Sequence, residues 1–537
     1  MKMESPHAVL GRLWKKIPRQ LKVTFVSALV LGLFIHMQFM TNMMVNHDTA
    51  YQLHEYGPAY LSVGRWFGFV WEGLRGLNYS LTWIGSAMAL VFLAVAACLI
   101  ASCLTISKTP YCILLSWLVV SFPTVTSNFT YEVYHLSFSF LLSSLAAFVL
   151  IRAKHSLYFA WVFVALALSS YQGYISVTLG LLISALAADI LRRRFTKAKD
   201  LIITGVKYLV SIAIGYGAYS LILNLFLRAN NIQLTEYMAI NEFGGLTLAN
   251  LWQRLYDVYA YGFQYYFKDT YSVHNAVYLG FIGFKALFVV MALLAGLAIA
   301  AIVWVEKIYK NVALTVLLAF LLFLLPLGSH IVSLVAPTGM HMTMMYGLLC
   351  PLLFMVALLD LCADTLLLRL QNGRRWLAGA GCWALLAVLG LYCINYSEFA
   401  SQAYMRLELV NKQASAYAIM LFTRIQSEDF YTPERTIVLA GHAPVTASIA
   451  SLGETDRMAG VTQVIGPGMW SYTQYLENQL GIEQNIRYLN RNLPLSQREL
   501  DALLEMPLYP APGSIRLVGE EIFVRIAEWE YIVDKFD

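Results

Sequence analysis

Long apolar runs, separated by short polar connections, make up most of residues 1–394. A helix that crosses a bilayer needs about 20 predominantly apolar residues. The first run is long and lacks a small-residue cleavage site, so we interpret it as an anchor and not as a cleaved signal. The sequence predicts about 11 transmembrane helices, near residues 22–40, 82–104, 110–123, 135–151, 156–170, 173–191, 205–227, 276–304, 312–327, 342–362 and 376–394.

The apolar pattern stops after these runs, and residues 395–537 read as a small folded domain. A polar helix is expected over 395–420, a strand over 435–439 and a helix over 470–505. Two short apolar runs, 515–518 and 522–526, flank Gly519-Glu520-Glu521, which is typical of a β-hairpin. We predict a C-terminal α/β domain of ordinary size.

Composition narrows the class of protein. Hydrophobic residues make up 59% of the chain and charged residues only 13%, against about 25% charged residues in soluble globular proteins. This excludes an ordinary soluble enzyme and a disordered chain, and favours a polytopic membrane protein. The seven cysteines all lie in the apolar runs and none lies in 395–537, so no disulfide can brace the tail. We interpret them as small hydrophobic residues.

Charge is divided unevenly along the chain. Residues 1–394 hold 26 Lys and Arg against 14 Asp and Glu, whereas 395–537 hold 11 against 18. With the N-terminus in the cytoplasm, 20 of those 26 basic residues fall on the cytoplasmic side, as the positive-inside rule requires. The basic excess is therefore a property of the membrane part and not a sign of nucleic-acid binding. An odd number of helices then places the tail outside, with 41–80 and 228–275 as the larger outer loops and 124–134 as a shorter outer connection.

The first outer loop carries a clear periodicity. After Asn46-His47-Asp48-Thr49, seven residues recur at alternating intervals of three and four, which is one face of an amphipathic helix. Gly57-Pro58 interrupts the pattern, and proline is well placed to start a second helix. Together with Trp66 and Trp71, this predicts helices in the membrane interface. The apolar face consists of Leu53, Tyr56, Tyr60, Val63, Phe67, Val70 and Leu74.

Two charged residues of this loop each allow a structural and a chemical interpretation. Asp48 either caps a helix N-terminus or, at the headgroup plane where partial desolvation raises a carboxylate's pKa, acts as a general base. Arg65 either binds lipid headgroups or recognises a substrate phosphate with its forked donors.

Short motifs in a consistent order give the chain a family resemblance. Asn-x-Asp at 46–48 and Gly-Arg-Trp at 64–66 lie in the first outer loop. Further along are Pro123 with Asn128-Phe129-Thr130-Tyr131, then Tyr171-Gln172-Gly173-Tyr174, and finally Met506-Pro507-Leu508-Tyr509-Pro510 before Gly513-Ser514-Ile515. The chain resembles the bacterial serotype-converting glucosyltransferases of the Gtr type, which modify O-antigen.

This resemblance implies an α-helical polytopic membrane protein of GT-C-like fold in the bacterial inner membrane. Residues 1–394 would form the transmembrane glycosyltransferase domain, with periplasmic loops at 41–80 and 228–275, and 395–537 a periplasmic α/β domain. The implied reaction moves glucose from undecaprenyl-phosphate-glucose to a hydroxyl of lipid-linked O-antigen. The carboxylate expected in the first outer loop of such enzymes is Asp48. Single displacement inverts the anomeric carbon and needs one carboxylate as base.

Other residues are candidates for substrate binding. Glu55 lies about two helical turns after Asp48, and Arg254 and Lys268 follow Arg65 as candidates for the donor phosphate. Asp257 and Asp269 are reserve carboxylates in the aromatic segment 250–271, which suits either sugar stacking or an interfacial helix. Tyr131, Glu132 and His135 form either a polar wall of the site or a satisfied interfacial belt. Tyr171 and Gln172 interrupt two apolar runs and contact either the substrate or the interior of the bundle.

We expect no cofactor, and a divalent metal is optional because a phosphate leaves readily without one. His330 and His341 are too far apart across a loop to resemble metal ligands. The expected partners are the lipid-linked donor, the lipid-linked O-antigen acceptor and membrane lipid, with no nucleic acid. The tail is either a cap that admits the glycan or a stabilising domain without substrate contact.

Two other functions fit the same topology. A flippase for the lipid-linked sugar would place charged residues and broken helices near the bilayer midplane. Here the predicted spans are almost free of charge, and polar residues concentrate in the outer segments, which favours the enzyme. A glycan assembly factor remains the other alternative.

Overall fold

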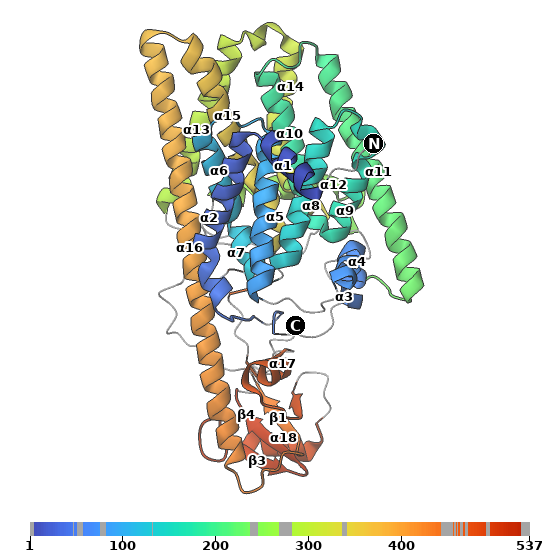
Figure 1. Cartoon of the computed structure of the whole chain (residues 1–537). Coiled ribbons are helices and arrows are strands. Elements are labelled where there is room, and N and C mark those ends of the chain that lie inside the picture. The colour runs from blue at the N-terminus through green and yellow to red at the C-terminus, as the bar shows by residue number, and fades with distance from the viewer. Residues whose placement is uncertain are drawn as a thin grey trace. The chain divides into compact units, whose positions relative to one another are not determined.

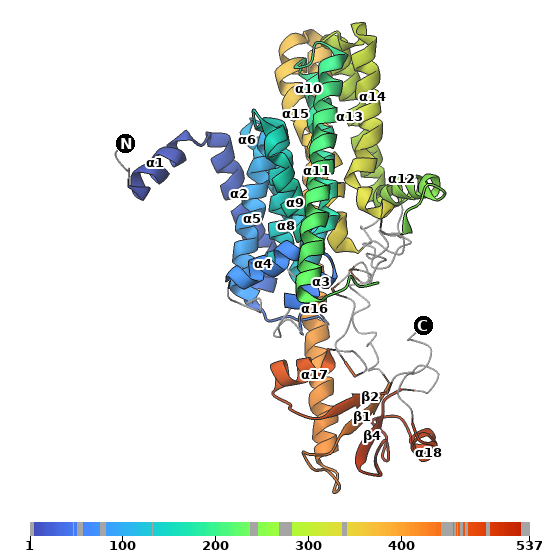
Figure 2. The same ribbon diagram turned by 90° about the vertical axis from the view of Figure 1, so that its right-hand side faces the viewer.

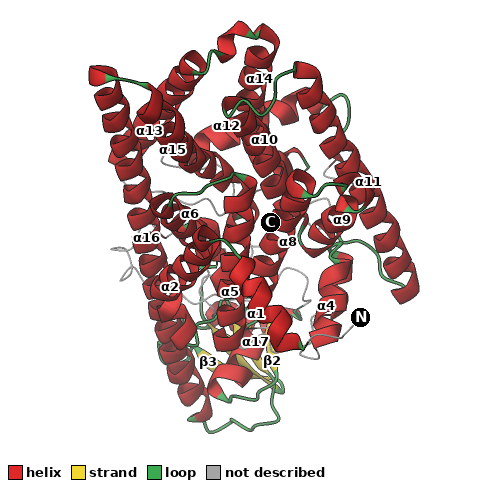
Figure 3. Ribbon diagram, turned by 45° about the horizontal axis from the view of Figure 1, so that its top comes forward, coloured by secondary structure: helices red, strands yellow, loops and turns green. Residues whose placement is uncertain are grey.

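The computed structural model describes two compact units (Figure 1). The first contains Met1–Asn42, Tyr56–Ser401 and Arg457–Ala459, and the second Met43–Glu55, Gln402–Asp456 and Gly460–Asp537, so far as these residues are described. The described residues are 5–46, 48–50, 57–75, 82–131, 133–236, 245–267, 282–335, 341–441, 455, 458, 460–461, 466–467, 471–489 and 495–527. Figure 3 shows helix as the regular structure of the first unit and strands confined to the second.

The first unit is a bundle of long apolar helices joined by short turns. Its helices are α1 Pro6–Lys16, α2 Arg19–Thr41, α3 Gly57–Ser62, α4 Trp66–Arg75, α5 Thr82–Cys103, α6 Thr109–Ser121, α7 Pro123–Thr130, α8 Val133–Arg152, α9 Ala160–Ser170, α10 Ile175–Leu191, α11 Ala198–Asn230, α12 Leu251–Phe267, α13 Ile282–Val305, α14 Val312–Ser329, α15 Leu349–Arg369 and the first part of α16 Asn372–Gln426. Short 3-10 helices are η1 Ser156–Tyr158, η2 Gln172–Tyr174, η4 Ile308–Lys310, η5 Ile331–Leu334 and η6 Met342–Leu348.

The chain is a multi-pass membrane protein. Within the described residues, nine helices are long and apolar enough to cross a bilayer, and the bent pair α6 and α7 would make a tenth. The apolar helix α9 has only 11 residues and would be the eleventh. Every predicted run is helical where it is described, and the number of spans stays a prediction.

One predicted outer connection is not an exposed loop. Residues 124–134 were expected to be a connection outside the membrane, yet α7 is entirely buried and continues α6 after a bend of 41°. The bend follows from Pro123, which has no N–H to donate and so ends the hydrogen-bond ladder of α6. The polar residues of α7 therefore belong to the interior of the bundle.

The second helix expected after Gly57-Pro58 is present, but it is divided into α3 and α4 by a break that the periodicity did not reveal. Helix α3 ends at Ser62, and Gly64, two residues later, has a φ of +76°. Gly64 N–H bonds to the Leu61 carbonyl and Arg65 N–H to the Tyr60 carbonyl, which is a Schellman cap. The break shifts the buried face, so that α4 buries Trp66 and leaves Leu74 75% exposed. The positions at 51–56, including Glu55, lie outside the described residues.

The aromatic segment 250–271 is a helix over its described part. Figure 2 shows α12 lying across the direction of the bundle helices, beside the end of α14. Tyr259 Oη bonds to the Phe323 carbonyl at 3.0 Å, and Val258 is fully buried. Trp252, Tyr256 and Phe263 are exposed, which is the pattern of a helix in a membrane interface.

The second unit is an α/β/α sandwich. Its strands are β1 Ile437–Ala440, β2 Ile486–Tyr488, β3 Ile515–Val518 and β4 Glu521–Arg525, in the order β2-β1-β4-β3. Strand β1 pairs in parallel with β2 and β4, and β3 pairs antiparallel with β4. Alternate β1 residues pack toward α16 on one face and toward α18 Gln497–Glu505 on the other, so all four are buried. Helix α17 is Tyr472–Tyr475, and Leu476–Leu480 continues it as a π-helical turn.

The predictions for the tail are mostly confirmed. Helix α16 continues without interruption through 395–420, β1 lies where a strand was expected, and the hairpin is β3–β4. The helical interpretation of 470–505 is wrong in its middle, because Ile486–Tyr488 is strand β2. Pairing with β1 makes this short segment a strand, although its local sequence has no strong strand pattern.

Candidate functional site

Several broken helices of the first unit meet at one end of the bundle, opposite the basic connections around Lys108, Arg193 and Lys310. Helices α3 and α4 lie at this end in Figures 1 and 2. Helix α4 contacts α9, η2 follows α9, and η6 contacts both η2 and α7. These elements bring together four predicted site residues: Arg65, His135, Tyr171 and Gln172.

Arg65 is the cation of this cluster. Its guanidinium carbon lies 4.6 Å from the centroid of the Tyr171 ring, a cation–π contact. Its Nε is buried and has no hydrogen-bond partner, and no acidic side chain pairs with Arg65 among the described residues. Tyr171 is itself held by a 3.2 Å hydrogen bond between its hydroxyl and Thr343 Oγ1. The site therefore presents a positive charge on a fixed aromatic ring.

The loop that carries Arg65 is clamped by two side chains. Gln172 Nε2 donates to the Val63 carbonyl at 2.9 Å, and Tyr219 Oη donates to the Gly64 carbonyl at 3.1 Å. Gln172 and Tyr219 also bond to one another at 3.1 Å. A Cβ on Gly64 would lie 2.7 Å from Gln172 Nε2 and 2.8 Å from Tyr219 Oη. Glycine is thus required both for its backbone conformation and for this close approach.

His135 fixes the neighbouring helices. Its Nε2 donates to the Ser170 carbonyl at 2.9 Å, at the end of α9. The Tyr60 ring lies 5.0 Å from the imidazole, and Gly68 leaves room for it because a Cβ there would approach within 2.8 Å. His135 is buried and joins α8 to the end of α9 and to the Tyr60 ring of α3.

A second layer of aromatic and polar groups lies beneath this cluster. Asn128 Nδ2 donates to Tyr174 Oη at 2.7 Å, and Tyr346 stacks on Phe140 at 3.8 Å between ring centroids. Tyr346 Oη donates to the Val119 carbonyl at 2.7 Å. We had not selected these residues as site residues. Asn128 and Tyr174 belong to the quoted motifs, which was the available signal, whereas Tyr219 and Tyr346 lie in apolar runs that give none.

Asp48 belongs to the second unit, and its turn is capped by Asn46. Asn46 Oδ1 accepts hydrogen bonds from the amides of Asp48 and Thr49, each at 2.9 Å, and Thr49 Oγ1 accepts from Asn46 N–H at 2.7 Å. The capping role considered for Asp48 is thus filled by Asn46, which is fully buried. The Asp48 side chain is half-buried.

Segment 43–50 is fixed to α16 by one amide side chain. Asn411 Nδ2 donates to the Val45 carbonyl at 2.9 Å, and Asn411 Oδ1 accepts from Val45 N–H at 3.1 Å. Val45 and Ala50 pack in the same apolar cluster as Ala414 and Ala418 of α16. The turn that carries Asp48 is therefore built into the core of the second unit.

The other predicted site residues lie apart or outside the described residues. Arg254 and Asp257 are on α12, where Asp257 Oδ1 accepts from Gln253 at 2.9 Å. Tyr131 ends α7. His330 is fully buried at the end of α14, and no group of three or more potential metal ligands occurs in the part of the chain that is described. Glu55, Glu132, Lys268 and Asp269 lie outside the described residues.

A comparison with protein families identifies the family to which this chain belongs. The model of the family "Glucosyl transferase GtrII" matches residues 37–352, more than half of the chain. The chain belongs to the GtrII glucosyl transferase family. The matched region runs from the end of α2 into α15 and includes both Asp48 and the Arg65 cluster. No curated protein and no solved structure matches the chain.

The clamp on Gly64 gives a first prediction for this glucosyl transferase. We expect Gly64→Ala to lower the free energy of unfolding by about 1–3 kcal/mol, because a strained φ and two close contacts are introduced together. Gly73→Ala on α4 is the control, since a Cβ there has open space and should change stability by less than about 1 kcal/mol. Melting in detergent measures both. Equal melting of the two variants would contradict the clamp.

The Asn411 contact gives a second prediction. Asn411→Ala should raise amide hydrogen exchange at Val45 by about tenfold, because it removes both hydrogen bonds that hold this residue. The control is Lys412→Ala, which removes only an exposed ion pair with Glu408 and should leave this exchange unchanged. Mass spectrometry of the full-length protein measures the exchange. Unaltered exchange in the Asn411 variant would show that other contacts hold the segment.

Proposed function

We propose that this protein transfers glucose from undecaprenyl-phosphate-glucose to a hydroxyl of lipid-linked O-antigen, at the periplasmic face of the bacterial inner membrane. Membership of the GtrII family supports glucosyl transfer. The distribution of basic residues supports the orientation, because the cluster around Arg65 lies at the bundle end opposite the basic connections.

The observation that carries the donor assignment is the unneutralised charge of Arg65. A cation at the edge of a membrane bundle is normally paired or functional. Arg65 has no acidic partner in the described residues, and its guanidinium rests on Tyr171 with the loop behind it clamped. A lipid phosphate would supply the missing anion, and the forked donors of arginine suit phosphate oxygens.

Asp48 is the proposed general base. Glucosyl transfer requires removal of the proton from the acceptor hydroxyl while the phosphate departs, and one carboxylate suffices for an inverting displacement. Asn46 fills the local capping role, so the turn does not require the Asp48 carboxylate as its N-cap. A GT-C-like fold would be consistent with the helical bundle and the broken helices at one end.

The base assignment predicts that Asp48→Asn lowers kcat by at least about 100-fold while the protein remains folded in membranes. The amide keeps the shape of the side chain and removes its basicity. The assay measures transfer of labelled glucose from undecaprenyl-phosphate-glucose to lipid-linked O-antigen in proteoliposomes. Asp257→Asn is the control and should retain transfer. Wild-type transfer by the Asp48 variant, with loss in the Asp257 variant, would move the base to α12.

The phosphate assignment predicts a different kinetic signature. Arg65→Gln should raise the KM for the donor by about tenfold or more, because a charged hydrogen bond to phosphate is lost. Arg65→Lys should recover part of this loss by restoring the charge without the fork. Arg228→Gln, at the exposed end of α11, is the matched control. An unchanged donor KM in the Arg65 variants would contradict a phosphate contact.

A further inference from the structure

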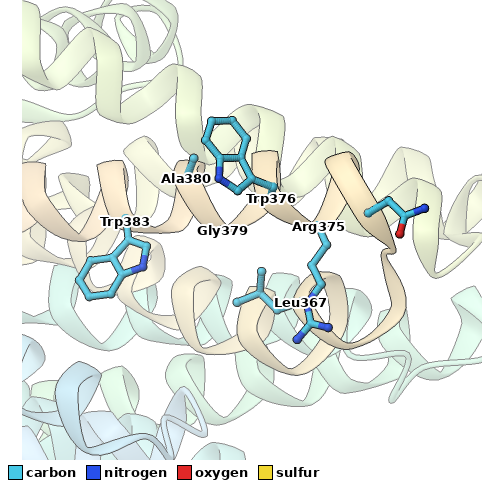
Figure 4. A pocket seen from close by; sticks show the side chains of 7 residues that line it. Leu367, Arg375, Trp376, Gly379, Ala380 and Trp383 are labelled. Atoms are coloured by element: carbon cyan, nitrogen blue, oxygen red, sulfur yellow. The ribbon is translucent and has the colours of Figure 1, made fainter.

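A groove lies between α15 and α16 at the basic end of the bundle, far along both helices from the broken-helix end. Its volume is about 610 Å³, within the range of ligand-binding clefts. Figure 4 shows Leu367 of α15 between the Arg375 guanidinium and the Trp383 indole of α16. Its lining residues are Leu367, Asn372, Arg375, Trp376, Gly379, Ala380 and Trp383.

The groove is polar at one end and apolar at the other. Asn372 and Arg375 lie in the first turn of α16, where the helix enters its apolar run. Trp383 is eight residues further on, about 12 Å along the helix axis. Trp376 and Trp383 are 72% and 73% exposed, and Leu368 and Leu377 beside the groove are also exposed. Tryptophan with this exposure at a helix end is typical of the membrane interface.

The charge at the polar end is not neutralised by the protein. Arg369 nearby pairs with Glu306 at 3.0 Å, and Lys108 pairs with Asp364 at 2.6 Å. Arg375, in contrast, has no hydrogen-bond or ion-pair partner for its side chain among the described residues, and no acidic residue lines the groove. The groove thus has an unpaired Arg375 at its polar end and an apolar, aromatic surface at the other end.

We propose that this groove binds an anionic phospholipid of the membrane, with the headgroup phosphate on Arg375 and Asn372 and an acyl chain along Leu367 and Trp383. Basic pockets between transmembrane helices recognise anionic headgroups in this way. The order of groups fits a lipid, because the charge lies at the membrane edge and the apolar surface lies deeper. A Cβ on Gly379 would make an ordinary van der Waals contact of 3.8 Å with Leu367 Cδ2, so a larger side chain at this position would enter the groove. This site is independent of the proposed transfer reaction.

The test measures binding of phosphatidylglycerol to the purified full-length protein by native mass spectrometry. Wild type should bind phosphatidylglycerol in preference to phosphatidylethanolamine, and Arg375→Gln should weaken that binding about fivefold. Gly379→Phe, which fills the floor without changing charge, should weaken it similarly. The matched controls are Arg374→Gln, whose residue does not line the groove, and Gly381→Phe, whose Cβ has open space. Both controls should bind as wild type does.

Each other result counts against the site. Equal loss in the Arg374 and Arg375 variants would show that lipid is attracted only by general basic charge. Equal binding of the two phospholipids would overturn anion recognition, and full competition by inorganic phosphate would overturn the contribution of the acyl chain. A dimer that persists after delipidation and dissociates on Trp383→Ala would assign the groove to a second copy of the chain. Should Gly379→Phe fail to fold, the comparison of Arg375 with Arg374 decides alone.

Discussion

A peptide group that leaves regular helix within the depth of a bilayer must find a hydrogen-bond partner inside the protein. The broken helices of this chain meet that constraint with side-chain donors. Tyr346 and His36 satisfy the Val119 and Val120 carbonyls, which Pro123 and the bend between α6 and α7 leave open. His135 does the same for the end of α9, and Thr124 for the start of η6. Tyr266 Oη bonds to the Leu348 carbonyl, where η6 meets α15. Part of the aromatic and polar content at this end of the bundle therefore serves the backbone of the broken helices.

The same constraint explains why the Arg65 loop has a fixed geometry. The carbonyls of Val63 and Gly64 are bonded by Gln172 and Tyr219, so the residue that follows them is held in one direction. Gln172 lies in η2, which is itself a break between α9 and α10. The break at η2 therefore stabilises the break between α3 and α4, and Arg65 lies where these two breaks meet. A site on rigid supports of this kind places its charge in advance and avoids reorganisation when the substrate binds.

The sequence predicted the helices better than it predicted their breaks. Long apolar runs identify spans because a bilayer requires them, and α16 and the β3–β4 hairpin were equally evident from pattern. The burial of α7 was missed because Thr124, Thr126 and Asn128 look like loop residues, and only tertiary contacts show that they are interior. The break at Gly64 was hidden because the spacing of Val63 and Phe67 continues the helical period across it. Among the residues gathered at the broken-helix end, motifs and polarity pointed to Arg65, His135, Tyr171 and Gln172. They did not point to Tyr219 or Tyr346, because a tyrosine in an apolar run usually serves only packing.

The turn that carries Asp48 is held partly by residues outside the region that matches the GtrII family. Asp48 lies within residues 37–352, which match the GtrII family, but Asn411 and the α16 residues that pack on Val45 and Ala50 lie outside that region. Asn46 Nδ2 also donates to the Gly460 carbonyl, and Asn478 Nδ2 donates to the Ala50 carbonyl, each at 3.5 Å. A proposed base on a short turn needs such fixed neighbours, because a carboxylate must be held at one distance from the acceptor hydroxyl to be effective. The residues of the second unit that follow Gln402 therefore contribute to the geometry of the Asp48 turn.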